Sequence, residues 1–185
     1  MPLFVHLARI MLPFMVQAES SSMRSEAVSM KVPTTFQHIK VNVPESHKVD
    51  PEMAATEIKF YDGSGQQIST QPDKVSVSGE YSGEYAKSKL VDGDTSDNSA
   101  WVPSRSTSQY GWFAYDFGTT PPQVSAVEIF WCNYWPTRGR NANPQRYTIE
   151  GSNDGGQTWQ QLKVSGCASP QGSCRNGKEQ LALGL

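Results

Sequence analysis

Short stretches of alternating apolar and polar residues constrain this chain more than any other feature. Ile39, Val41 and Val43 share one face of a first predicted strand, and Ile58 and Phe60 share a face of a second. The same pattern recurs at residues 75–77, 113–117 and 147–151, with glycine-containing turns at 62–65 and 153–156. Residues 127–134 are apolar or aromatic on both faces apart from Glu128 and Asn133, as in a strand inside a sandwich. A period of two, broken by turn signals, predicts an all-β sandwich. No 3.6-residue apolar period is long enough to predict a major helix.

Length and charge exclude several classes of protein. A chain of 185 residues is enough for one main domain with its own core. Its formal net charge of −2 argues against a dedicated nucleic-acid binder, because such proteins usually carry a basic face. No stretch approaches the ~20 apolar residues that a membrane-spanning helix needs. We therefore expect no nucleic-acid partner and no transmembrane segment.

The N-terminal region divides into two parts by composition. Residues 1–18 are mostly apolar, contain no acid and end in Val16-Gln17-Ala18, which predicts a cleaved secretory signal. A disordered or amphipathic N-terminal segment is the alternative. Residues 19–32 are polar and rich in Ser and Met, as in a linker. The predicted domain is 33–185, and its predicted location is secreted or on the extracellular surface.

The three cysteines fit an oxidising compartment without requiring one. Cys167 and Cys174 bracket a short polar loop that a disulfide could close. Cys132 lies in an apolar run and is expected to be a buried thiol.

The segment 90–101 is unusually rich in oxygen ligands. Asp92, Asp94 and Asp97 flank or follow Gly93, together with several hydroxyl and amide side chains. Ca²⁺ takes six to eight oxygens from such groups, so this turn could enclose the ion. It is not an EF-hand loop, because Asp97 and Pro103 stand where that motif needs glycine and glutamate. An Asx-rich surface turn without a metal explains the composition equally well.

Three segments, taken together, carry a resemblance to a known family. They are the Asp-Gly…Trp turn at 92–101, the strand Trp112-Phe113-Ala114-Tyr115-Asp116-Phe117-Gly118, and the hairpin 147–159 with its Ser-Asn-Asp-Gly turn and a following tryptophan. In this order they resemble the discoidin domains, which include the coagulation-factor type C domains and galactose-binding carbohydrate-binding modules. The resemblance implies an eight-stranded antiparallel jelly-roll sandwich of the galactose-binding-domain-like type. It also implies a structural Ca²⁺ ion and a ligand site made by loops at one end.

The chain departs from the family pattern at its end. Residues 160–185 contain nothing like the two closing strands of the family, whereas 36–41 and 54–62 do resemble them. The domain is either circularly permuted, which close chain termini permit, or a truncated fragment of a tandem pair. Permutation requires the early strands to join the sandwich built by the later ones. We expect Ile58 and Phe60 to lie in the sheet that carries Tyr147 and Ile149.

The resemblance also implies a set of metal ligands. An acid at the start of the family's closing strand joins the Asp-Gly turn in binding Ca²⁺, and Glu57 falls at that place. The implied ligands are Asp92, Asp94, Ser99 and Glu57, with backbone carbonyls around Lys89 and Ala55. The turn is longer than the usual pattern, so either Asp94 or Asp97 could reach the ion. The alternative for Glu57 is an exposed strand residue with no metal role.

Ligand recognition is assigned to two loops. In loop 133–146, an exposed Trp135 could stack on a pyranose, and Arg and Asn side chains could donate to sugar hydroxyls. The candidate ligand-binding residues are Trp135, Arg138, Arg140, Asn141, Asn143 and, just past the turn, Arg105 beside Trp101 and Tyr110. The alternatives are a Trp135 buried under its own loop and a solvated basic turn at the arginines. Trp101, Trp112 and Trp159 are expected in the core.

These observations favour binding over catalysis. The sequence contains no phosphate-binding glycine loop, no His-Glu-x-x-His and no Gly-x-Ser-x-Gly. The first hypothesis is a non-catalytic, lectin-like carbohydrate-binding module that is stabilised by Ca²⁺ and binds a glycan or glycoconjugate. The alternative on the same scaffold is a cell-adhesion domain that binds a protein or a lipid headgroup through Arg138 and Arg140. An accessory piece of a larger enzyme is a third hypothesis.

Overall fold

The computed structural model describes residues 35–45, 53–104, 111–132, 144, 146–165 and 178–184. All of them belong to the compact unit Val32–Leu185. The predicted signal (1–18), the linker (19–32) and the predicted disulfide Cys167–Cys174 lie outside the described residues.

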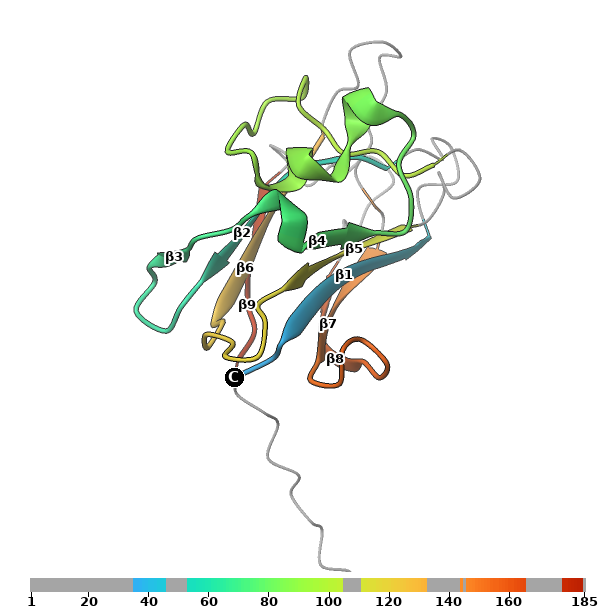
Figure 1. Ribbon diagram of the computed structural model, residues 1–185. Coiled ribbons are helices and arrows are strands. Elements are labelled where there is room, and N and C mark those ends of the chain that lie inside the picture. The colour runs from blue at the N-terminus through green and yellow to red at the C-terminus, as the bar shows by residue number, and fades with distance from the viewer. Residues whose placement is uncertain are drawn as a thin grey trace, which may run out of the picture. The chain divides into compact units, whose positions relative to one another are not determined.

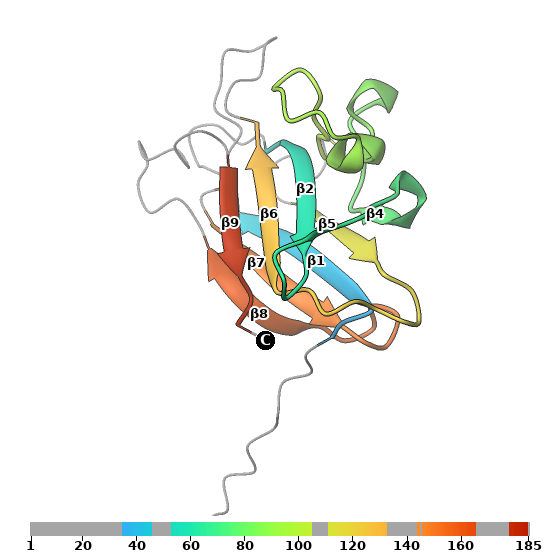
Figure 2. The same cartoon turned by 90° about the vertical axis from the view of Figure 1, so that its left-hand side faces the viewer.

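Two antiparallel sheets face each other and form a sandwich (Figure 1, Figure 2). In spatial order, the five-stranded sheet contains β4 (Val75–Val77), β5 (Gly111–Asp116), β1 (His38–Glu45), β7 (Arg146–Ser152) and β8 (Gln160–Ser165). The four-stranded sheet contains β3 (Gln67–Ile68), β2 (Ala55–Tyr61), β6 (Ala126–Trp131) and β9 (Lys178–Ala182). Among the described residues between β3 and β5 there are three 3-10 helices: η1 (Pro72–Lys74), η2 (Gly83–Tyr85) and η3 (Lys87–Val91). The predicted all-β sandwich is confirmed. The described residues form nine strands rather than eight, of which β3 has two residues.

Strand β1 occupies the middle of the five-stranded sheet. Lys40 pairs with Ala114 of β5 on one side and with Glu150 of β7 on the other. The residues just before β1 and those just after β9 lie at the same end of the sandwich (Figure 1, Figure 2). The early part of the chain is thus an integral part of the sandwich and not an appendage.

The two sheets share one apolar core. Val41, Phe113 and Ile149 point inward from the five-stranded sheet, and Phe60 and Ile129 point inward from the other; each is at most 1 % exposed. Burying a side chain of this size contributes about 1.5–3 kcal/mol to stability. The alternating positions of each strand supply these residues, as the sequence pattern predicts.

The expectation that Ile58 and Phe60 share a sheet with Tyr147 and Ile149 is wrong. The first two residues lie in β2 of the four-stranded sheet, and the other two lie in β7 of the five-stranded sheet. All four still belong to the same core cluster. Alternation tells which face of a strand is buried, but it does not tell which of two facing sheets the strand joins.

The tryptophans divide between core and surface. Trp101 is fully buried, and its Nε1 donates to the carbonyl oxygen of Gly79 at 3.1 Å. Trp112 and Trp159 are partly exposed, so the expectation that they lie in the core is wrong. Trp112 falls on the outward-facing side of β5, between the buried residues Gly111 and Phe113. The cysteine expectation holds, because Cys132 is 1 % exposed.

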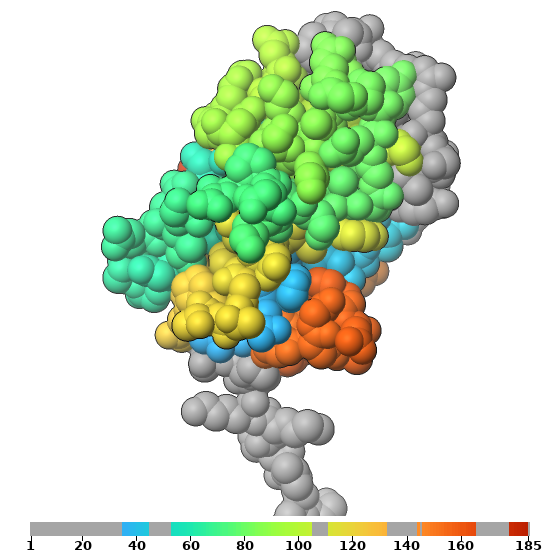
Figure 3. Space-filling model, in the orientation of Figure 1, coloured from blue at the N-terminus to red at the C-terminus, as the bar shows by residue number. Residues whose placement is uncertain are grey.

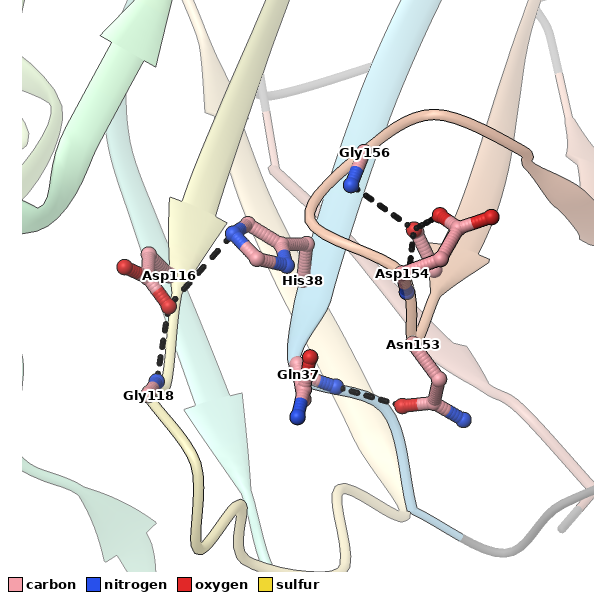
Figure 4. A network of polar contacts seen from close by, with 8 residues as sticks. Gln37, His38, Asp116, Gly118, Asn153, Asp154 and Gly156 are labelled. Carbon is pink, nitrogen blue, oxygen red and sulfur yellow. Dashed lines mark hydrogen bonds and ion pairs between the residues drawn. The ribbon is translucent and has the colours of Figure 1, made fainter.

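The β7–β8 turn is closed by the polar residues of its Ser-Asn-Asp-Gly-Gly sequence. Asp154 accepts hydrogen bonds from the side chain and backbone of Thr158, and these bonds hold the pKa of Asp154 well below its usual range. Gly155 and Gly156 have φ of 71° and 81°, a conformation that favours glycine. Asn153 ties the turn to the start of β1 by accepting the Gln37 N–H at 2.9 Å (Figure 4).

Candidate cation site and ligand loops

The oxygen-rich turn lies against the beginning of β2. Figures 1 and 2 show the segment 83–104 at the end of the sandwich where β2 begins, away from the β7–β8 turn. The backbones of Ala55 and Trp101 exchange two hydrogen bonds of 2.8 and 3.1 Å. The Thr56 hydroxyl donates to the carbonyl oxygen of Thr95 at 3.4 Å. These bonds fix the turn on the strand that carries Glu57.

Glu57 is buried beneath the turn. Glu57 is only 2 % exposed, and its Oε2 accepts the N–H of Gly93 at 3.0 Å. Gly93 has φ of 82°, which favours glycine at this position and directs its N–H toward the carboxylate. The pairing of β2 with β6 shifts its register between Ala55 and Glu57, and such irregularities, β-bulges among them, commonly re-aim side chains. The alternative of an exposed strand residue is therefore wrong for Glu57.

Asp92 organises the turn itself. Its Oδ1 accepts the N–H of Asp94 at 2.9 Å, and its Oδ2 accepts the hydroxyl of Ser99 at 2.8 Å. The ammonium nitrogen of Lys89 lies 3.5 Å from the same Oδ2. Ser99 is 3 % exposed, whereas the Asp92 side chain is about a quarter exposed. One oxygen of this carboxylate thus lies close to a buried hydroxyl and a cation.

Asp94 and Asp97 differ in the hydrogen bonds that they make. Asp94 is exposed, and its Oδ1 accepts the N–H of Ser96 at 2.8 Å, which lowers the pKa of Asp94. Asp97 is partly exposed, and its backbone carbonyl accepts the thiol of Cys132 at 3.8 Å. Asp94 is therefore engaged as a turn-capping side chain.

The electrostatics of this site centre on Glu57. Burial raises the pKa of Glu57 from its usual value of 4.5 to about 7, and the negative charges of Asp92 and Asp94 act in the same direction. The Gly93 N–H and the charge of Lys59 act in the opposite direction. The folded chain thus places a buried carboxylate next to other acids, an arrangement that a bound cation would relieve.

The donor chemistry fits a hard cation, but the acids alone do not form a closed site. Glu57, Asp92 and Ser99 offer only oxygen ligands, as Ca²⁺ prefers. Throughout the described part of the chain, no group of three or more His, Cys, Asp or Glu side chains is placed to hold a metal ion. A Ca²⁺ ion here would need backbone carbonyl and hydroxyl oxygens in addition to the carboxylates.

The predicted ligand-binding residues cannot be placed in this site. Trp135, Arg138, Arg140, Asn141, Asn143 and Arg105, as well as Tyr110, lie outside the described residues. Trp101, which was grouped with Arg105, is buried and cannot stack on a ligand. The sequence reasoning overlooked the partly exposed Trp112 and Trp159, although the inward positions of Phe113 and Tyr115 already imply that Trp112 faces outward.

Comparison with known families gives the chain an identity. The family model described as F5/8 type C domain matches residues 74–180, more than half of the chain. The chain belongs to the F5/8 type C domain family. This is the discoidin family, whose domains are binding modules for glycans, lipids or proteins. The match is to a non-catalytic binding domain, and no catalytic domain is detected.

Two central strands of this F5/8 type C domain, β1 and β2, precede the matched residues. Strands β1 and β2 end at Glu45 and Tyr61, yet β1 lies between β5 and β7, and β2 pairs with β6. Residue 57 also lies before the match, although its side chain reaches Gly93 within it. The matched segment is therefore completed by strands from outside it.

Other comparisons add little. No curated protein and no solved structure matches the chain. Within the described ranges, no helix has both the length and the apolar character needed to cross a membrane.

Proposed function

We propose that this F5/8 type C domain is a non-catalytic carbohydrate-binding module whose fold is stabilised by a structural Ca²⁺ ion. The family supports the general class, which is a binding module. The single observation that carries the Ca²⁺ proposal is the buried Glu57 carboxylate. It lies under an acidic turn and accepts the N–H of Gly93, which is 36 residues away in the sequence.

The proposed ion is bound by Glu57, Asp92 and Ser99 together with backbone carbonyls near Lys89 and Ala55. Burial, together with the nearby charges of Asp92 and Asp94, raises the pKa of Glu57, and a cation between Glu57 and Asp92 would favour the ionised form of the buried carboxylate. It also links β2 to the turn, so ion binding adds directly to folding stability. Binding requires the Lys89 ammonium to move away from Asp92. An affinity of about 10⁻⁴–10⁻³ M is typical of extracellular Ca²⁺ modules and suits the proposed secreted or cell-surface location.

One further carboxylate is proposed to complete the ion site. The Asp94 side chain already accepts the Ser96 N–H, whereas the backbone carbonyl of Asp97 accepts the thiol of Cys132. Calorimetric Ca²⁺ titrations of Asp94→Asn and Asp97→Asn distinguish the two. The substitution that weakens Ca²⁺ binding identifies the ligand, and normal binding by both variants contradicts the proposal that either acid completes the site.

The glycan is proposed to bind at the rim loops. The support is chemical: Trp135 offers a flat apolar ring for a pyranose face, and Arg138, Arg140, Asn141, Asn143 and Arg105 offer donors to hydroxyl groups. Sites of this kind combine an aromatic platform with a few directed polar groups. The ion is proposed to stabilise the end of the sandwich rather than to touch the sugar.

A glycan array tests this function with the full chain. Binding should be present with Ca²⁺ and weaker with a chelator, and Trp135→Ala should remove the contribution of the rim loops to it. Charge reversal of Arg138 and Arg140 should have a smaller effect. The matched control is Lys163→Glu, a charge reversal on the exposed strand β8. The contrary result is a blank array together with salt-sensitive binding to acidic vesicles or to an acidic protein, which favours the adhesion function through the arginines.

A further inference from the structure

The outer face of the five-stranded sheet carries a row of side chains that crosses four strands. The strand register places Trp112 of β5 opposite Asn42 of β1, Asn42 opposite Thr148 of β7, and Thr148 opposite Val164 of β8. Three inter-strand spacings of about 4.8 Å make this row about 14 Å long. Trp112 is partly exposed and Val164 is 42 % exposed. The row therefore has apolar groups at both ends, with the partly exposed Asn42 amide and the Thr148 hydroxyl, on a residue that is only 9 % exposed, between them.

The neighbouring row contains a charge pair that is already neutralised. Ser76, Ala114, Lys40, Glu150 and Gln161 lie opposite one another in successive strands. The Lys40 ammonium lies 2.6 Å from Glu150 Oε2, and both side chains are only about 15 % exposed although they face outward. Thr148 donates to Glu150 Oε1 at 2.7 Å. These two rows thus form a polar floor on which the lysine and glutamate charges cancel.

Trp159 lies over one end of this floor. The Lys40 ammonium is 4.1 Å from the centre of the indole, and the His38 ring meets it edge-on with centroids 6.5 Å apart. His38 itself is held by Asp116 at 3.5 Å, beside the β7–β8 turn (Figure 4). A Cβ on Gly156 would come within 3.1 Å of the indole, so the turn packs tightly on Trp159. This second indole is therefore fixed in place while remaining partly exposed.

We propose that this sheet face, defined by Trp112, Trp159, Asn42, Thr148 and Lys40, is a second binding site that takes a neutral oligosaccharide. Two partly exposed indoles provide apolar surfaces, of which the Trp159 ring has the Lys40 ammonium over it. Asn42 and Thr148 both donate to Glu150 Oε1, so the Asn42 carbonyl oxygen is the group in this row that is proposed to accept from a sugar hydroxyl. The paired charges of Lys40 and Glu150 favour a neutral ligand over an anionic one. A row about 14 Å long favours an oligosaccharide over a single sugar. Atoms of β1 and β5 are visible at the surface between the segment 75–104 and the β7–β8 turn (Figure 3).

Calorimetric titration of the full chain with a panel of neutral glucan, mannan and galactan oligosaccharides, and with their monosaccharides, tests this site. The Trp135→Ala background removes the proposed rim-loop contribution, so the remaining binding reports the sheet face alone. In that background, Trp112→Ala and Trp159→Ala should each weaken binding roughly tenfold, the upper range for one lost aromatic stacking contact. Phe130→Ala is the matched control, because Phe130 is a partly exposed aromatic residue on the outward side of β6 in the other sheet.

Hydroxyl-radical footprinting of the unsubstituted chain removes any dependence on how the variants fold. The oligosaccharide should slow the oxidation of Trp112 and Trp159 and leave that of Phe130 unchanged. The proposal is overturned if no member of the panel binds in the Trp135→Ala background, if both tryptophan substitutions leave binding intact, or if only a charged polymer binds. Loss of all binding on Trp135→Ala supports the rim-loop function and overturns this one, so the two outcomes are distinguishable.

Discussion

Replacing Glu57 by glutamine should stabilise the chain in the absence of Ca²⁺, and adding Ca²⁺ should remove most of that difference between the variant and the wild type. Burial and the nearby acids raise the pKa of Glu57 from 4.5 to about 7 in the folded chain. Between these pH values the folded chain binds more protons than the unfolded chain, so the free energy of unfolding falls as the pH rises. This difference in pKa between the folded and unfolded chain corresponds to about 3 kcal/mol of stability, and this stability is lost by about pH 8.

Glutamine has the shape of the protonated carboxylic acid and keeps an oxygen that can accept the Gly93 N–H. Without Ca²⁺ at about pH 8, Glu57→Gln should therefore be more stable than the wild type by up to about 3 kcal/mol. At about pH 5 the two should be nearly equal. With Ca²⁺ at a hundredfold excess over its dissociation constant, the wild type should gain about 2.7 kcal/mol and the variant should gain little.

Urea unfolding followed by tryptophan fluorescence measures each of these free energies. Glu84→Gln is the matched control, because Glu84 is exposed in η2 and its substitution should leave both the pH dependence and the Ca²⁺ response unchanged. Equal pH dependence in the wild type and in Glu57→Gln would refute the reasoning about the buried carboxylate. An equal Ca²⁺ response in both would refute the role of Glu57 as a ligand.

Two further substitutions probe the packing of the sandwich. Tyr147→Phe removes the hydroxyl that donates to Glu179 of β9, and leaving that carboxylate without this donor should cost about 1–3 kcal/mol in urea unfolding; an unchanged stability would contradict the tie between the sheets. Gly151→Ala would place a Cβ 2.5 Å from the ring of Phe36, so the melting temperature should fall by an amount equivalent to about 1–3 kcal/mol. Gly63→Ala meets no atom within 4 Å and should leave the melting temperature nearly unchanged, so equal effects of the two glycine substitutions would contradict the described packing.

Much of the fold follows from the alternation of side chains. Ile39, Val41 and Val43 are predicted to share a buried face, and each is at most 1 % exposed. The sheet to which each strand belongs does not follow, because a strand with one apolar face can complete either layer of a sandwich. The position of β2 opposite β7, rather than beside it, depends on long-range pairing with β6 that no local pattern encodes.

The candidate site, too, could be predicted from the sequence only in part. The composition of the turn and the position of Glu57 both point to an acidic cluster, and the structure brings Glu57 against Gly93. The sequence does not reveal that Asp94 caps the turn through Ser96, because that depends on the local backbone conformation. Residue type also misplaces Trp112 and Trp159, since a tryptophan on the outward side of a strand or beside a turn has the same composition signal as one in the core.

Diffraction from crystals grown with Ca²⁺ tests the central claim most directly, namely that a strand from before the matched family segment carries an acid to the metal-binding turn. The expected result is an anomalous density peak bounded by the carboxylates of Glu57 and Asp92 and the hydroxyl of Ser99, with β1 between β5 and β7. An ordered turn without a peak, in which Glu57 still accepts only the Gly93 N–H, would contradict the ion site. A sandwich closed without β1 and β2 would contradict the architecture on which that site depends.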